Sequence, residues 1–176
     1  MPFWFHHGVD REFGGVLSVM QEDGKQLSTD KYLWSQGRWL WVVSAVYNRL
    51  EQRPECLQSA RDTAQFLLKH GRDDQGRWCF AVTREGQPLV GPTSIFSDCF
   101  AVYGLSEYYR ATHDEEALDV ALKAFNRICH RVEQPDFNEV APATLNPGRR
   151  AHAVPMILTE IANELAQTTG DATIEA

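Results

Sequence analysis

Hydrophobic residues follow two patterns along this chain, and the two patterns alternate. In three segments, which begin near residues 35, 95 and 153, apolar side chains occupy most of the helical circumference, as expected for helices buried on several sides. The segments between them keep their apolar residues on one face, which indicates half-exposed helices. An alternation with a spacing of roughly 60 residues predicts a double ring in which inner helices are covered by outer ones. Three inner helices would form only an arc.

Capping and turn residues set the expected helix boundaries. Proline suits the first turn of a helix and glycine its end, and a capping-box pattern marks the start of another helix at Thr112-His113-Asp114-Glu115. The expected helices run from Leu33 to Leu50, from Pro54 to about Gly71, from about Ile95 to Ala111, from the capping box past Ile128, and from about Val154 to Thr168.

Two small β-ribbons complete the expected fold. The first lies on either side of Asp23-Gly24, and the second occupies residues 72 to 92, where glycine again marks tight turns. Residues 134 to 150, rich in Pro, Asn and Gly, predict a loop. We therefore expect an all-α fold of about five helices with two ribbons, as a single domain over 1–169 followed by a disordered tail over 170–176.

Composition narrows the classes of partner. The net charge is −7, which argues against nucleic acid or an anionic membrane surface, because either requires a basic face. No apolar run approaches the length needed to cross a bilayer, and the first residues lack the pattern of a signal peptide. A cytoplasmic location is expected. The four cysteines are scattered without metal-ligand spacing, which predicts buried thiols and neither a zinc site nor disulfides.

Polar residues at the start of the first largely apolar helix are the strongest candidates for ligand binding or catalysis. Trp34, Gln36 and Arg38 lie in the run WSQGR, and polar groups that enter a buried helix need a partner or a ligand. Arg38 could hold a sugar hydroxyl or a developing enolate oxygen through its fork of donors. The alternative is an ion pair with Asp30 or Asp98, and this stretch alone leaves the two interpretations equal.

Five blocks in order along the chain resemble the N-acylglucosamine 2-epimerase family. The combination of WxQGR, FS-x-x-F and VPMIL is specific as a set, and the similarity extends from residue 3 to about residue 166. The blocks are FWFHHGVDREFGGVLSVMQEDGK, STDKYLWSQGRWLW, FAVTREGQPL, SIFSDCFAVYGLSEYYRATHDEEAL and HAVPMILTEIANEL.

The resemblance implies an (α/α)6 barrel with its pocket at one end of the inner helices, and epimerisation of a sugar next to its carbonyl carbon. Arg38 corresponds to the family's pocket arginine. The family's two catalytic histidines, with an accompanying glutamate, lie in a second half that this chain lacks, and the outer helix expected before Phe3 is missing too. We therefore expect a partial toroid, a fragment that is inactive alone.

Further expected site residues have weaker support. Trp34 could stack on a sugar ring, Gln36 belongs to the same polar cluster, and Asp98 lies near the start of the third helix, where a cap or ion pair is at least as good an explanation. His152 lies close to a pocket histidine of related isomerases but is one position out of step. The expected ligand is N-acetylglucosamine, N-acetylmannosamine or a related hexose, and no metal or organic cofactor is required.

Two other classes of protein stay open. An incomplete ring leaves inner helices uncovered, so a non-catalytic binding protein, or a homodimer formed through those helices, is a second hypothesis. A third is another carbohydrate-active enzyme on the same ring, such as a glycoside hydrolase or lyase. That chemistry requires two carboxylates beside a cleft, and no such pair stands out in the sequence.

Overall fold

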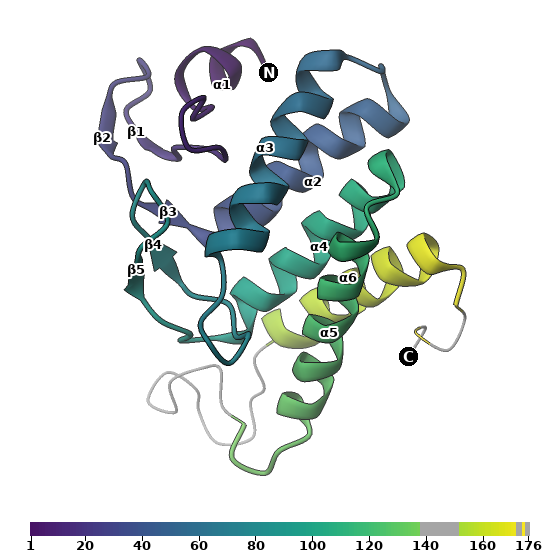
Figure 1. The fold of residues 1–176 in the computed structure, drawn as a ribbon. Helices are drawn as coiled ribbons and strands as arrows, with labels where there is room; N and C mark the ends of the chain where they lie inside the picture. Colours follow the sequence, from purple (N-terminus) through teal and green to yellow (C-terminus); the bar gives the residue numbers. More distant parts are fainter. Residues whose placement is uncertain (138–151, 172–173, 175–176) are drawn as a thin grey trace.

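A computed structural model describes residues 1–137, 152–171 and 174, and most of them are helical (Figure 1). The helices of this part are α1 (Pro2–His7), α2 (Leu33–Arg49), α3 (Pro54–His70), α4 (Ile95–Thr112), α5 (Glu115–Val132) and α6 (Ala153–Thr169). The five long helices agree with the sequence prediction to within a few residues at each end. The predicted loop over 134–150 and the predicted tail over 170–176 fall largely outside the described residues. No helix in the described ranges combines the length and apolar character needed to cross a membrane.

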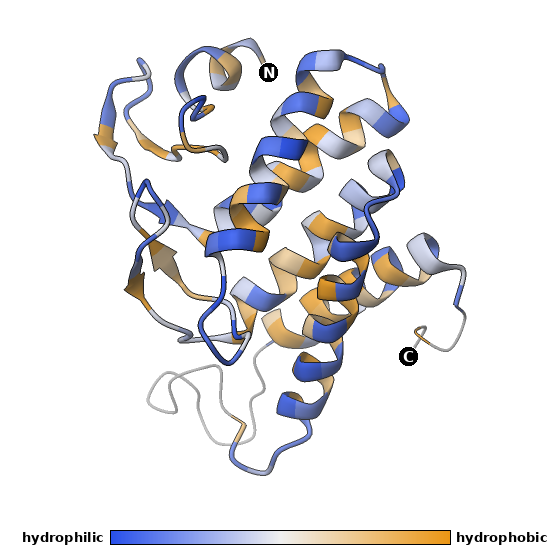
Figure 2. Cartoon of the chain, in the orientation of Figure 1, coloured by the Kyte–Doolittle hydropathy of each residue, from blue (hydrophilic) through white to orange (hydrophobic). Residues whose placement is uncertain are grey.

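Inner and outer helices alternate as the hydrophobic pattern predicts. Helix α4 packs against α2 on one side and α6 on the other, while α3 covers α2 and α5 covers α4 (Figure 1). Apolar residues of α5 face α4 and its hydrophilic residues face outward (Figure 2). The result is an arc of three inner helices with two outer helices against it.

Two glycines allow α2 and α4 to approach closely. A Cβ atom on Gly37 would lie 2.2 Å from the carbonyl oxygen of Phe100, and one on Gly104 would lie 2.5 Å from the carbonyl oxygen of Gly37. Neither position accepts a larger residue without moving a helix backbone, because both obstacles are main-chain atoms. The sequence analysis did not assign a role to these glycines.

Side-chain caps mark the starts of α4 and α5. The Ser94 hydroxyl accepts a hydrogen bond from the Phe96 N–H at the start of α4. The carboxylate of Asp114 accepts from the N–H groups of Glu116 and Ala117 at the start of α5. The predicted capping box at Thr112 is wrong, because Thr112 is the last residue of α4 and the cap is Asp114.

The β-structure is one strand richer than predicted. Strands β1 (Val19–Met20) and β2 (Gln26–Ser28) form the expected antiparallel ribbon, with Gly24 in the turn at a φ of 89°. The second ribbon, β4 (Ala81–Val82) with β5 (Pro88–Val90), gains a third strand, β3 (Lys31–Tyr32), which pairs with β4. Strand β3 leads directly into α2, so the sheet fixes where that helix begins.

The aromatic cluster at the start of the chain forms a short helix that the sequence did not predict. Trp4 and Phe5 on α1 contact the ring of Trp39 on α2, with ring centroids 6.2 and 5.7 Å apart. These contacts give the aromatic residues of the cluster a packing partner on α2.

Candidate functional site

A pocket of about 600 Å³ lies beside the N-terminal half of α2. Its walls come from α1, the β1 region, β3 and α2, and they are mainly apolar and aromatic. Arg38 is the charged side chain among them. The lining residues are Met1, Trp4, Val16, Ser18, Val19, Tyr32, Trp34, Ser35, Arg38, Trp39, Val42 and Phe80.

Arg38, on the wall of this pocket, contacts two aromatic rings and, among the described residues, no carboxylate. Its guanidinium carbon lies 4.9 Å from the ring centroid of Phe100 and 5.5 Å from that of Trp34. The side chain is exposed. Among the described residues it pairs with neither Asp30 nor Asp98, the two ion-pair partners that the sequence suggested. Its N–H groups are therefore available to a ligand.

Gln36 has a different position from the sugar contact that the sequence predicts. Its side chain is fully buried, its amide oxygen accepts from the Val16 N–H at 2.8 Å, and its amide nitrogen donates to the Val16 carbonyl at 2.7 Å. Both ends of the amide are thus occupied. Gln36 shapes the pocket by fixing Val16 in its wall, and not by facing into it.

A buried ion cluster also holds the loop that precedes Val16. The Lys31 ammonium lies 3.0 Å from the Asp10 carboxylate and donates to the Gly14 carbonyl at 2.7 Å, while Arg84 contacts Asp10 at 2.8 Å. Burial alone would raise the pKa of Asp10, but the hydrogen bonds from Arg84 and Lys31 outweigh it and lower that pKa. The sequence analysis missed this cluster, because its members are up to 74 residues apart.

The other two predicted contacts, Asp98 and His152, do not line the Arg38 pocket. Asp98, in the first turn of α4, lines a second cavity of about 680 Å³ between α4 and α5, where its carboxylate is 4.0 Å from Arg127. His152 is exposed immediately before α6 and is not part of the wall of the Arg38 pocket. The structure therefore places Arg38 and Trp34 on one pocket wall, and neither Asp98 nor His152 lines that pocket.

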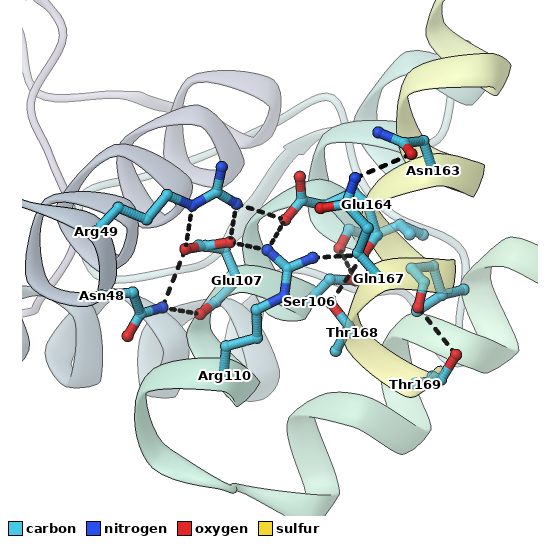
Figure 3. A network of polar contacts seen from close by, with 12 residues as sticks. Asn48, Arg49, Ser106, Glu107, Arg110, Asn163, Glu164, Gln167, Thr168 and Thr169 are labelled. Atoms are coloured by element: carbon cyan, nitrogen blue, oxygen red, sulfur yellow. Dashed lines mark hydrogen bonds and ion pairs between the residues drawn. The ribbon is translucent and has the colours of Figure 1, made fainter. Parts of the chain in front are cut away.

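At the opposite end of the inner helices lies a polar clasp that joins all three (Figure 3). We define the clasp as Arg49 on α2, Glu107 and Arg110 on α4, and Glu164 on α6. Arg49 contacts Glu107 at 2.5 Å and Glu164 at 3.4 Å, and Arg110 contacts Glu107 and also Glu164, the latter at 2.6 Å. Because it joins the C-terminal halves of α2, α4 and α6, these helices run in the same direction.

The two carboxylates of the clasp titrate differently. Burial, followed by the hydrogen bond with Glu107, raises the pKa of Glu164 to about 7. Burial acts in the same direction on Glu107, but hydrogen bonds from Arg49 and Asn48 outweigh it and lower its pKa. Glu107 is fully buried and Glu164 is 4% exposed.

Sequence inspection found no carboxylate pair, yet the structure brings these two glutamates together. Their partners are the arginines of the same cluster, so the pair serves to hold the helices together. It gives little support to a hydrolase that needs two carboxylates beside a cleft.

Comparison with known proteins gives one consistent result. Residues 6–174 match the family model described as N-acylglucosamine 2-epimerase. The N-acylglucosamine 2-epimerase of Mus musculus is 31% identical over 178 residues, which cover 98% of this chain and 42% of the relative. The cellobiose 2-epimerase of Bacteroides fragilis is 35% identical over 130 residues, covering 73% of this chain and 33% of the relative.

The same relationship holds for the fold. The structure of cellobiose 2-epimerase from Bacillus thermoamylovorans B4167 superposes with a TM-score of 0.86 at 24% identity, over 99% of this chain and 49% of that one. The chain thus covers less than half the length of each of these proteins. The expected partial (α/α)6 toroid is confirmed by this likeness.

Proposed function

The chain belongs to the N-acylglucosamine 2-epimerase family, and on that premise we propose that it forms the sugar-holding half of a sugar 2-epimerase or isomerase. The observation that supports this most directly is Arg38, a cation on the pocket wall whose N–H groups have no protein acceptor in the described structure. A cation on a pocket wall without a carboxylate partner can donate hydrogen bonds to an oxygen that gains negative charge.

The proposed chemistry is removal and return of a proton at C2 of an open-chain sugar. Negative charge then develops on the carbonyl oxygen at C1, and Arg38 donates hydrogen bonds to it. Trp34 offers a ring face to the apolar side of the sugar. Asp98 and His152 have less support than these two, because the first belongs to another cavity and the second is exposed outside the pocket.

The proton transfers need acid/base groups close to the pocket. None of the histidines in the described part of the chain lines the Arg38 pocket, and the glutamate with a pKa of about 7 lies at the opposite end of the helices. We therefore propose that this chain binds the sugar and supplies Arg38, whereas the acid/base pair comes from the part of the ring that completes it.

Sugar binding to the chain tests this proposal. N-acetylmannosamine, N-acetylglucosamine and mannose are titrated by ligand-observed NMR, and each sugar is also incubated to measure interconversion. We expect binding that weakens about tenfold or more in Arg38→Ala, the order expected for a hydrogen bond to a charged group, with no turnover. The control is Arg61→Ala, an exposed residue of α3.

Robust interconversion by the chain alone would contradict the proposed division of roles. Sugar binding that Arg38→Ala leaves unchanged would remove Arg38 from the site.

A second candidate function is association through the uncovered inner helices, and a specific observation favours it. Val42 on the α2 side is 38% exposed within the apolar pocket wall, and Met156 on α6 is 57% exposed. A homodimer that covers the exposed sides of α2 and α6 would bury both side chains. Analytical ultracentrifugation over a concentration series tests it: a dimer that Val42→Asp and Met156→Asp dissociate is expected, and a monomer at all concentrations argues against it.

A further inference from the structure

We propose that Phe100 and Trp34 form an aromatic seat that positions the Arg38 guanidinium at the pocket wall, so that both are positioning residues for the sugar site. The aromatic seat is defined as the rings of these two residues. Its significance for catalysis rests on the function proposed above, but its existence can be measured without any sugar.

Two helices contribute the seat. Trp34 precedes Arg38 by one turn of α2, whereas Phe100 comes from α4. The two ring centroids are 6.4 Å apart and the rings are inclined by 51°. Two inclined rings contact the guanidinium from two directions. They therefore limit its position more than a single stacked ring would.

The close approach of α2 and α4 makes this geometry possible. Gly37, next to Arg38, leaves no room for a Cβ atom against the Phe100 backbone. The Phe100 ring therefore reaches the Arg38 guanidinium across the helix interface. Phe100 thus takes part in the helix packing through its backbone and contacts Arg38, a residue of the pocket wall, through its ring.

Aromatic contacts hold the arginine without occupying its donors. A guanidinium attracts a ring through its charge and its flat face, while its five N–H groups point outward in its own plane. Arg49 illustrates the other outcome: it also lies over a ring, 5.3 Å from Trp41, but its N–H groups donate to Glu107. Arg38 is held in place and its donors stay available to a sugar oxygen.

Ring-current shifts test the seat directly. The Arg38 side-chain signals, identified by their loss in Arg38→Lys, are recorded by NMR in the chain without ligand. We expect an upfield displacement that diminishes in Phe100→Leu and persists in Phe100→Tyr, which keeps the ring. Phe137→Leu is the matched control, since that ring lies beside Arg131 on α5. Arg38 signals that do not respond to Phe100→Leu overturn the proposal.

A double-mutant cycle tests the consequence for the sugar. Phe100→Leu is expected to weaken N-acetylmannosamine binding about two- to fivefold, the range of a cation–π contact at an exposed site. The same change in an Arg38→Ala background should have less than about half that effect on a logarithmic scale, and Phe100→Tyr should restore binding. Equal losses in both backgrounds would mean that Phe100 acts through general packing, which contradicts a positioning role.

The two proposals fail in different ways. If the ring-current shift is present but Arg38→Ala leaves sugar binding unchanged, the proposed function fails and the seat stands. If sugar binding depends on Arg38 but its signals do not sense Phe100, the seat fails. Circular dichroism of each variant identifies any loss of folding, and Phe100→Tyr provides the comparison if Phe100→Leu does not fold.

Discussion

Arginine side chains have different partners at the two ends of the inner helices. At the C-terminal end, Arg49 and Arg110 contact two nearly buried glutamates, so all four side chains of the clasp have polar partners (Figure 3). At the N-terminal end, Arg38 rests on aromatic rings and has no carboxylate in the described structure. The same residue type stabilises the fold in one place and stays available to a ligand in the other, because the difference lies in its acceptors.

The largest expected effect is the loss of the central carboxylate of the clasp. Glu107→Ala leaves two arginines and Glu164 without their shared partner, and we expect a loss of about 3 kcal/mol in the free energy of unfolding, measured with urea. Lys123→Ala is the control, because its pair with Asp119 is exposed. A loss below about 1 kcal/mol would show that the clasp contributes little to stability.

A smaller loss is expected at the pocket end when Gln36 is replaced. Gln36→Leu keeps the approximate size of the side chain but leaves the buried Val16 N–H and carbonyl without partners. We expect about 2 kcal/mol of destabilisation in the same urea measurement. Hydrogen exchange at the Val16 amide should also accelerate; unchanged exchange would mean that another group holds the loop.

The clasp should also make stability depend on pH. The pKa of Glu164 is raised from 4.5 to about 7, so the folded state binds this proton more tightly than the unfolded chain does. The stabilisation is therefore complete below about pH 4.5 and is lost as the pH rises through 7. Glu107, whose pKa is lowered, acts in the opposite sense only below its ordinary value.

We expect the free energy of unfolding to decrease by about 1 kcal/mol between pH 5 and pH 8 from this group, after allowance for its arginine neighbours. Glu164→Gln should flatten the profile in that range. A profile with the same slope in both proteins would assign the pH dependence to other groups.

The smallest expected effect on stability is the one that matters most for function. Arg38→Ala removes only contacts with ring faces, so the free energy of unfolding should change by less than about 1 kcal/mol. Arg49→Ala, measured beside it, should cost more, because Glu107 loses a partner in the interior. Equal losses of unfolding free energy in the two variants would contradict the difference proposed between the two ends of the inner helices.

The sequence predicts most of the helical framework, since inner and outer helices differ in how far apolar residues extend around them. It predicts the helix N-termini less well, as Asp114 shows, because several residues in succession can serve as a cap. The short α1 was missed because its stability depends on contact with Trp39, more than 30 residues away.

Site residues were predictable by type and not by partner. Arg38 and Trp34, one turn apart on α2, both line the pocket. Gln36 was expected to face a ligand, and only the folded chain reveals that Val16 occupies its amide. The clasp could not be foreseen, because Glu107 and Glu164 are brought together by the packing of α4 against α6 and by no local pattern.

The glycine contact between α2 and α4 also keeps these two inner helices close together. When a given number of helices surrounds a common axis, the radius of the ring decreases as the helices approach one another. A bulky residue at Gly37 or Gly104 would flatten the wall and move Arg38 outward from the axis. The absence of side chains at these two positions thus sets the spacing of two neighbouring helices in the wall of the arc.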